Sequence, residues 1–332
     1  MERDRKKYTI EDIAKELGVS KTTVSRALSG KGRIGRETVE RVRAFVEEHE
    51  YRPNAVARGL AKRRTCNLGL VIPVEYTDVP FFKVCMDGIC EEASAHNYDI
   101  ILVVTREDSL LPLERLVANH KVDGIILTRA TVNSGAVRFL KKQGVPLVVI
   151  GPSDDSEVPS IDNPNREASR ELTSLLLMKG LRRLSLIGGN SLHYVTGERK
   201  QGFLDAHRDM GFHVNDALIF MEVDDYRTAM RAAGQLLLAE SDGIVCMDDN
   251  ISSLVLGCLR EKGVEVPSMI RLASLYDSRQ MERNLPPVTS LQFDTRGLGR
   301  NACMEMLRLL GEEMEEEFIS MNYQVVLRES TK

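Results

Sequence analysis

The stretch "YTIEDIAKELGVSKTTVSRALSG", residues 8–30, predicts two short helices joined by a tight turn. Thr9 followed by Asp12 resembles a capping box, in which each side chain bonds to the other residue's backbone at a helix start. Gly18 can adopt the left-handed conformation that ends a helix, and Ser20 is a favoured N-cap for the next one. Two short helices separated by about three residues that include Gly are typical of a helix-turn-helix.

The second predicted helix has one apolar face and one polar face. Val24, Ala27 and Leu28 recur at helical spacing, so we expect them to face inward. A further apolar repeat in "RETVERVRAFVEEHEY", residues 36–51, predicts a third helix that closes a small core. The outward residues of the second helix carry short hydroxyls or basic groups, and they are Lys21, Thr22, Ser25 and Arg26.

This outward face is suited to DNA. Arg and Lys side chains pair well with O6 and N7 of guanine, so we expect Lys21, Thr22 and Arg26 to reach base edges in the major groove. Other hydroxyls are expected to bind phosphate groups, which position the helix without specifying sequence. The residues expected to contact phosphate are Ser20, Thr23, Ser25 and Ser29. The competing interpretation is an ordinary helical bundle whose polar face is only solvated.

The charge of the chain is distributed unevenly over its 332 residues. Residues 1–64 carry 17 Lys and Arg against 10 Asp and Glu, whereas the remainder carries 28 against 39. A small basic module joined to a larger acidic one indicates that the small module meets a polyanion. The length also predicts two or three domains.

From residue 67 the pattern becomes that of an α/β fold. Short, continuously apolar segments alternate with helical patterns, which predicts parallel sheets built from βαβ units. The most economical arrangement is two similar lobes, which begin with residues 67–161 and 162–290. The chain then returns to the first lobe in residues 291–322 and to the second in residues 323–332. The predicted strands fall at 68–74, 100–104, 124–128, 146–150, 183–189, 242–247, 270–276 and 323–330.

Polar side chains follow several of these apolar segments. Ligands of such folds bind beyond the carboxyl ends of the strands, so these residues are candidates for a ligand site. Carboxylates and a guanidinium can hold vicinal hydroxyls by paired hydrogen bonds, as a sugar or nucleoside site requires. Any one of the acids could instead be a helix N-cap or a surface carboxylate. The candidates are Asp162, Arg199, Asp277 and the pair Asp248 and Asp249, of which either could face the ligand.

Several function classes lack support in the sequence. There is no P-loop, no G-x-S-x-G and no H-E-x-x-H motif, and the six His residues have no metal-ligand spacing. We therefore expect no enzyme, no cofactor and no metal site. The N-terminal residues contain no apolar signal segment, no stretch is long enough to span a membrane, and the six Cys include no C-x-x-C pair. These features predict a cytoplasmic chain with reduced thiols.

The stretch "YRPNAVARGLAKRRT", residues 51–65, adds a second diagnostic pattern. Together with residues 8–30 and the apolar segment "CNLGLVIP" that follows, it resembles the lactose/galactose repressor (LacI/GalR) family of bacterial transcription regulators. The resemblance covers nearly the whole chain. It implies an all-α helix-turn-helix domain at residues 1–52 and a hinge helix and linker at residues 53–66. A two-lobed, periplasmic-binding-protein-like α/β core with parallel sheets would occupy residues 67–332.

The resemblance also implies roles for individual residues. In that family the hinge helix forms on operator DNA, enters the minor groove and inserts a Leu, which corresponds here to Leu60. Phe81 and Phe82 match an aromatic pair that walls the ligand site beside the candidates named above. The other residues expected in the minor-groove hinge are Asn54, Ala57 and Arg58.

The implied function is ligand-controlled binding to DNA. We expect a repressor that binds palindromic double-stranded operator DNA as a homodimer, because one recognition helix reads only a half-site. A small effector between the lobes, a carbohydrate or nucleoside, would change operator affinity by its different affinity for the two states. The alternative is a catabolite-control regulator of the same fold that responds to a phosphorylated carrier protein. A solute-binding protein for transport would have no use for the first 65 residues.

Overall fold

The computed structural model describes residues 8–29, 32–49, 51, 64–74, 79–106, 109–129, 131–153, 155–314 and 316–332. The chain divides into two compact units, Met1–Thr65 and Cys66–Lys332. In the described part of the chain, no helix is both long enough and apolar enough to cross a membrane. The residues predicted to form the minor-groove hinge lie outside the described residues, and these are Asn54, Ala57, Arg58 and Leu60.

The first unit contains the helices α1 (Ile10–Glu16), α2 (Lys21–Ser29) and α3 (Arg36–Glu48). α1 begins with the predicted capping box. The Asp12 N–H donates to Thr9 Oγ1 at 3.3 Å, and the Thr9 N–H donates to Asp12 Oδ2 at 2.8 Å. Gly18 has a φ of +67°, the left-handed conformation that ends α1. The helix-turn-helix predicted from the sequence is therefore confirmed.

The core of this unit is formed by the predicted apolar faces. Ile13, Val24 and Val42 are fully buried, and Ala27 is 2% exposed. Leu28 is half-buried and packs against this cluster. The polar face of α2 is therefore turned to solvent, as the spacing of its apolar residues predicts.

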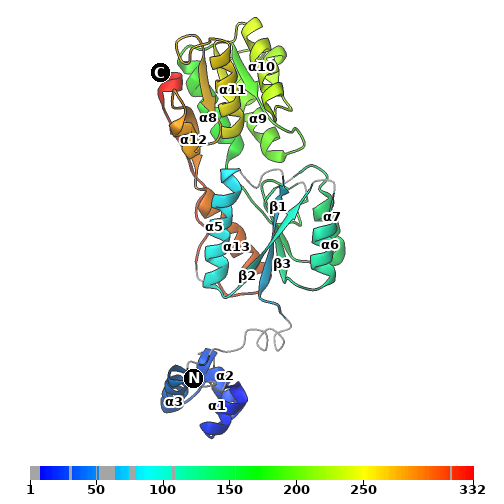
Figure 1. Ribbon diagram of the computed structural model, residues 1–332, viewed down its shortest axis with the longest axis vertical. Helices are drawn as coiled ribbons and strands as arrows, with labels where there is room; N and C mark the ends of the chain where they lie inside the picture. Colours follow the sequence, from blue (N-terminus) through cyan, green and yellow to red (C-terminus); the bar gives the residue numbers. More distant parts are fainter. Residues whose placement is uncertain are drawn as a thin grey trace, which may run out of the picture. The chain divides into compact units, whose positions relative to one another are not determined.

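The second unit contains two α/β lobes (Figure 1). The elements of the first lobe are β1 (Asn67–Pro73), α5 (Pro80–Ala95), β2 (Asp99–Thr105), α6 (Leu111–Ala118), β3 (Gly124–Leu127), α7 (Gly135–Gln143), β4 (Leu147–Ile150), β5 (Ser160–Ile161) and α13 (Thr295–Leu309). Its sheet is parallel, with strand order β2-β1-β3-β4-β5. α5 and α13 cover one face of this sheet, and α6 and α7 cover the other (Figure 1).

The second lobe follows the same plan around a larger sheet. Its elements are α8 (Asn165–Met178), β6 (Leu184–Ile187), α9 (Tyr194–Asp209), η2 (Asp216–Leu218), β7 (Ile219–Phe220), α10 (Tyr226–Leu238), β8 (Gly243–Cys246), α11 (Asp249–Glu261), β9 (Arg271–Ser274), α12 (Arg279–Arg283), β10 (Thr289–Phe293), β11 (Tyr323–Val326) and η3 (Glu329–Thr331). The strand order is β11-β10-β9-β8-β6-β7, and the strands are parallel except for β11, which is antiparallel to β10. α8 and α9 pack on one face, and α10 and α11 on the other.

The chain crosses between the lobes three times. It passes from β5 to α8 after Ile161, from β10 to α13 after Phe293, and back to β11 before Tyr323. Helices cover both faces of each sheet, which explains why the strands read as continuous apolar segments in the sequence. The predicted fold class, a helix-turn-helix domain followed by a two-lobed α/β core with parallel sheets, is confirmed.

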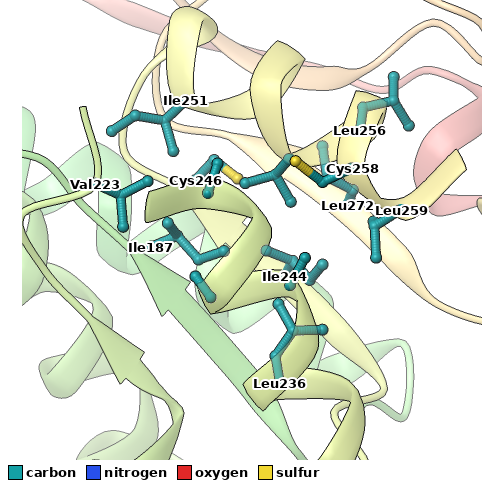
Figure 2. Close-up of a cluster of buried hydrophobic side chains, with 14 of the residues drawn as sticks. Ile187, Val223, Leu236, Ile244, Cys246, Ile251, Leu256, Cys258, Leu259 and Leu272 are labelled. Atoms are coloured by element: carbon teal, nitrogen blue, oxygen red, sulfur yellow. The ribbon is translucent and has the colours of Figure 1, made fainter. Parts of the chain in front are cut away.

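Figure 2 shows an apolar core of the second lobe, between its sheet and the helices α10 and α11. Cys246 and Cys258 lie within this cluster, and burial raises the pKa of both thiols. All six cysteines are free, and four of them are buried. Val223 and Ile251 belong to the same cluster and also line a cavity between the lobes. The core therefore extends to the wall of this cavity.

Close helix crossings hold the helices that border the cavity. A Cβ atom on Gly202 of α9 would lie 2.2 Å from the carbonyl oxygen of Arg166 on α8. In the first lobe, a Cβ atom on Gly88 of α5 would lie 2.1 Å from the carbonyl oxygen of Arg296 on α13. Because glycine has no Cβ, it permits both approaches, and α9 and α5 sit at a fixed depth on their neighbours. Both helices carry residues that line the cavity.

Candidate functional site

The first candidate site is the polar face of α2. Lys21, Thr22, Ser25 and Arg26 are exposed, and Thr23 is half-buried. The side chains predicted to read bases therefore share one solvent-facing surface in the first unit. Such a surface of short hydroxyls and cations matches the groups that contact bases and phosphates in a DNA groove.

Ser20 and Thr23 have a structural role in addition to the predicted phosphate contacts. Ser20 Oγ accepts a hydrogen bond from the Thr23 N–H at 3.1 Å, and the two hydroxyl oxygens are 2.8 Å apart. These bonds cap α2, which agrees with Ser20 as the predicted N-cap. The side chain of Ser29 lies outside the description of the structure.

Glu11 is a neighbour of the polar face that the sequence patterns did not identify. Its carboxylate forms an ion pair with Lys21, and both side chains are exposed. Arg41 of α3 holds the preceding turn, because its Nη2 donates to the carbonyl oxygen of Leu17 at 2.9 Å. Glu11 lies ten positions before Lys21, so only the packing of α1 against α2 brings the two charges together.

The second candidate site is a cavity of about 720 Å³ between the two lobes. Phe81 and Phe82 line it from the first lobe, as the resemblance implied. The predicted residues that line it from the second lobe are Asp162, Arg199, Asp248 and Asp249. Other charged or polar residues that line it include Arg106, Arg129, Asn163, His193, Glu222 and Asp224.

Arg199 links three elements of the second-lobe wall. Its Nη1 donates to the carbonyl oxygen of Met247 at 2.6 Å, and its Nε donates to Asn165 Oδ1 at 3.2 Å. Asn165 Nδ2 donates in turn to Asp162 Oδ1 at 3.1 Å. Burial lowers the pKa of Arg199, and nearby carboxylates, first that of Asp248, raise it. Arg199 Nη2 has no hydrogen-bond partner among the described residues, so it remains available to a ligand.

Asp162 and Asn163 follow β5, and both line the cavity. Burial raises the pKa of Asp162 to about 6, while the Asn163 N–H and Arg199 act to lower it. Asn163 is 7% exposed, and its Oδ1 has no hydrogen-bond partner in the described structure. A buried acceptor without a partner is unfavourable by about 1–3 kcal/mol. A hydrogen-bond donor that reached this oxygen would remove that unfavourable contribution.

The structure distinguishes the two adjacent acids that the sequence left open. Asp248 is the N-cap of α11, where its Oδ1 accepts the Ile251 N–H at 2.8 Å, and burial raises its pKa. Asp249 is the first residue of α11 and is 3% exposed. Its carboxylate has no hydrogen-bond or ion-pair partner among the described residues, although it lines the cavity. Asp249 is thus the acid that remains available to a ligand.

Aromatic rings border the cavity and connect the two lobes. The ring centroids of Phe81 and Phe82 are 5.2 Å apart, edge to face, and Phe81 lies 5.9 Å from the ring of Tyr276 in the second lobe. The Tyr276 hydroxyl is 3.2 Å from Thr295 Oγ1 at the start of α13. Burial raises the pKa of Tyr276 to about 12, so the phenol stays neutral. These rings offer an apolar surface for the carbon atoms of a ligand.

Other contacts join the lobes through the segment after β3. Arg129 Nη1 lies 3.0 Å from His193 Nε2, and the Val132 N–H donates to the carbonyl oxygen of Leu192 at 3.0 Å. The Arg129 guanidinium also lies 5.8 Å from the centroid of the Phe82 ring. Arg129 follows the carboxyl end of β3, the same signal that pointed to the acids, so the sequence contained the information to find it.

Asp277 does not line the cavity, which corrects the prediction for this residue. Its Oδ1 accepts hydrogen bonds from Ser290 Oγ at 2.6 Å and from Arg328 Nη1 at 2.9 Å. Both Asp277 and Arg328 are largely buried in this pair. Arg328 lies 51 positions further along the chain, so the sequence around Asp277 gives no sign of it.

The walls of the cavity differ in charge. From the second lobe the charged residues that line it are Asp162, Arg199, Glu222, Asp224, Asp248 and Asp249. From the described part of the first lobe they are Arg106 and Arg129. Carboxylates therefore predominate on one wall and cations on the other. Within the described ranges, no cluster of three His, Cys, Asp or Glu side chains is arranged to hold a metal ion.

Two family models match the chain. The model for bacterial regulatory proteins of the lacI family matches residues 9–54, which include the helix-turn-helix. The model for periplasmic binding proteins and the sugar binding domain of the LacI family matches residues 65–325, which include both lobes and the cavity. Together they cover both units of the structure.

Individual proteins are similar over nearly the full length. Catabolite control protein A of Staphylococcus aureus (strain N315) is 26% identical over 330 residues, which are 98% of this chain and 99% of that protein. The protein of the same name from Staphylococcus xylosus is 27% identical over the same length, with the same shares of the two chains. Each identity is an average over both units of the chain.

Solved structures have the same fold. A complex of the transcriptional regulator CelR with cellobiose superposes with a TM-score of 0.72 at 27% identity, over 97% of this chain and 99% of that chain. A lac repressor dimer bound to operator and the anti-inducer ONPF gives a TM-score of 0.77 at 20% identity, over 98% of this chain and 99% of that chain. Both comparisons include the first unit as well as the core.

Proposed function

Since the chain belongs to the LacI family of bacterial regulatory proteins, and is thus a ligand-controlled DNA-binding transcription regulator and not an enzyme, we propose that it is a repressor controlled by a sugar-like effector. The effector binds in the cavity between the lobes and changes the affinity of the first unit for operator DNA. Because it acts on DNA, the protein works in the cytoplasm.

The observation that carries this proposal is the arrangement of polar groups around Arg199. A cavity of about 720 Å³ is lined by Arg199 with an available Nη2, by Asp249 with a buried carboxylate, and by Asn163, whose Oδ1 is unpartnered. This volume is in the range of small-molecule sites. Hydrogen-bonding groups beside the rings of Phe81 and Tyr276 suit a ligand with several hydroxyls on a carbon ring. The cellobiose complex of a similar regulator supports a carbohydrate.

The DNA-reading role rests on the exposed face of α2. Lys21, Thr22 and Arg26 would read bases, and the neighbouring hydroxyls would hold phosphates, as on the predicted face. One such helix reads only a few base pairs, so a palindromic operator and a homodimer are proposed. Leu102 and Val104 support a homodimer, because they are 49% and 38% exposed on the edge strand β2 and a second copy would cover them. The lac repressor structure is such a dimer on operator DNA.

Control by the effector follows from the contacts that join the lobes. Two contacts hold the lobes in one arrangement around the cavity. One joins Arg129 and His193, and the other joins Tyr276 and Thr295. An effector that touches both walls binds this arrangement more tightly than a more open one. It therefore shifts the population between two states of different operator affinity.

A second candidate function is control by a phosphorylated carrier protein, which the similarity to catabolite control protein A favours. Recognition of a phosphorylated residue needs a cluster of unpaired cations. Two arginines of the core surface are already paired, because Arg296 binds Glu91 and Arg300 binds Glu92 and Glu316. The polar cavity makes the sugar-like effector the first choice. Operator binding that depends on a phosphorylated carrier protein and not on small molecules would favour the second.

The test combines Arg199→Ala with a ligand screen. Operator sequences are first enriched from random duplexes with the wild-type chain, and their binding is then measured with sugars and nucleosides added. We expect Arg199→Ala to keep operator binding and to lose the response, with ligand affinity lowered at least about tenfold, because a charged hydrogen-bond donor is removed.

The control is Arg208→Ala, which removes an exposed guanidinium from the same helix and should leave the response unchanged. Melting curves of both variants establish that the core is folded. A response with the wild-type midpoint in Arg199→Ala would show that the effector binds elsewhere.

A further inference from the structure

We propose that the effector carries a positively charged amino group in addition to its hydroxyls, as an amino sugar does. This inference rests on the proposed function of the cavity and names the chemical class of its ligand. It depends on three observations: an excess of hydrogen-bond acceptors, an excess of buried negative charge on one wall, and one carboxylate without a protein partner.

Acceptors exceed donors on the second-lobe wall. Of the Arg199 nitrogens, Nη1 is used by the carbonyl oxygen of Met247 and Nε by Asn165, so Nη2 is the donor left for a ligand. Asn163 lines the same cavity, and its buried Oδ1 has no hydrogen-bond partner in the described structure. Asp249 adds a carboxylate that receives no hydrogen bond among the described residues. A ligand that binds these three groups therefore donates more hydrogen bonds to them than it accepts from them.

Acidic side chains outnumber basic ones around Arg199 on this wall. Arg199 is one cation beside three acids, Asp162, Asp248 and Asp249, each of which interacts with it electrostatically. The helix start of α11 compensates Asp248, whose Oδ1 accepts the Ile251 N–H. Asp249 follows it on the same helix and is 3% exposed without an ion-pair partner. A cationic group of a ligand is a suitable partner for a carboxylate in this position.

A neutral sugar satisfies the acceptors but leaves the charge uncompensated. An ammonium group is a compact cation with three donors, so it can bind the Asp249 carboxylate and donate to neighbouring oxygens as well. The first-lobe arginines, Arg106 and Arg129, lie on the opposite wall and could bind an anionic substituent of the same molecule. The amino group is therefore assigned to the second-lobe wall, whether or not the ligand also carries an anionic substituent.

Matched pairs of sugars test the inference on the wild-type protein. Binding to the full chain is measured by calorimetry for glucosamine against glucose, galactosamine against galactose, and glucosamine 6-phosphate against glucose 6-phosphate. We expect the amino member to bind at least about tenfold more tightly in one or more pairs, because a hydrogen bond between charged groups is gained. Equal or weaker binding of the amino member in every pair overturns the inference.

The variant Asp249→Asn then locates the amino group. It keeps the size of the side chain and removes its charge, so the ratio of the amino-sugar affinity to the neutral-sugar affinity should fall at least about tenfold. The control is Asp216→Asn, which removes an exposed carboxylate of the same lobe outside the cavity and should keep the preference. An undiminished preference in Asp249→Asn overturns the assignment.

Different results would contradict the sugar-like effector and the amino group on it. If neutral sugars bind and alter operator binding while amino sugars do not, the sugar-controlled repressor stands and the amino group is wrong. If no member of any pair binds while operator DNA is still bound, the sugar-like effector and the amino group are both wrong. Melting curves of Asp249→Asn without ligand establish that the variant is folded.

Discussion

Two arginines that the sequence singled out lie in opposite environments. Arg26 is exposed on α2 of the first unit, whereas Arg199 is buried in the wall of the cavity and bonds to Met247 and Asn165. Removing an exposed guanidinium has little effect on a fold, so the loss is measured in binding alone. Removing a buried one leaves its partners without hydrogen bonds and affects binding and stability together. A mutation on the DNA-reading face is therefore expected to change binding alone, whereas a mutation in the cavity wall is expected to change both binding and stability.

The largest effect is expected for a substitution in the buried region around Arg199, at Gly202 of α9. In Gly202→Ala the new Cβ atom would lie 2.2 Å from the carbonyl oxygen of Arg166, so α9 must move away from α8. We expect the free energy of unfolding to fall by about 3 kcal/mol, the upper range for an overpacked site. Denaturant unfolding of the full chain measures it, and ligand affinity should fall too because Arg199 lies on the displaced helix.

Gly197→Ala is the matched control for this substitution. Gly197 lies on the same helix, and no atom comes within 4 Å of a Cβ atom placed there. Alanine favours helix over glycine by about 0.5–1 kcal/mol, so this variant should be as stable as wild type or slightly more stable. Equal stabilities of the two variants would show that α8 and α9 do not depend on the close approach at Gly202.

A smaller effect is expected on the exposed side, for Arg26→Ala. The substitution should reduce operator affinity by about 1–3 kcal/mol and relax the base preference at one position of each half-site. The free energy of unfolding should stay unchanged, since Arg26 is exposed. Binding to the enriched operator and to random duplexes is compared by fluorescence anisotropy. Equal losses on both DNAs would mean that Arg26 contacts phosphate and does not read a base.

The smallest effect is expected for the pH dependence of stability, through Asp162 in the cavity wall. Burial raises its folded-state pKa from 3.8 to about 6, so the folded chain holds this proton more tightly than the unfolded chain does. Stability from this group is therefore present at low pH and is lost as the pH rises from about 4 through 6. Arg199 acts against the raised pKa, and Glu198 acts with it.

The measurement compares wild type with Asp162→Asn at two pH values without ligand. Between pH 5 and pH 7 we expect wild type to lose about 1 kcal/mol more stability than the variant, which has no carboxyl at this position. Other acids titrate in both proteins, so their contributions cancel in the difference. An identical pH dependence of the two proteins would show that Asp162 ionises normally in the folded state.

The sequence was sufficient for the fold because its signals are local. The capping box of α1, the stop at Gly18 and the spacing of Val24 and Ala27 each concern residues within one or two helical turns. The strands were readable because helices cover both faces of each sheet, so the strand residues are continuously apolar. Such patterns do not depend on which distant segments come together.

The composition of the site was only partly predictable, because it depends on distant partners. Asp277 looked like the other acids after strands, but Arg328, from near the end of the chain, binds it. Asp248 and Asp249 could not be separated until the start of α11 was known to one residue. Asn163 is notable because its buried Oδ1 lacks a hydrogen-bond partner in the described structure, and no sequence pattern indicates this.

The threefold passage of the chain between the lobes has a consequence for how such proteins can change in evolution. Each lobe is assembled from two separate stretches, since α13 belongs to the first lobe and β11 returns to the second. No single gene segment encodes a complete lobe. A new effector preference can therefore be acquired by point substitutions in the cavity or by exchange of the whole of Cys66–Lys332, whereas exchange of one lobe alone would require several simultaneous recombination events. The helix-turn-helix, in contrast, is one continuous segment and can be exchanged in a single event.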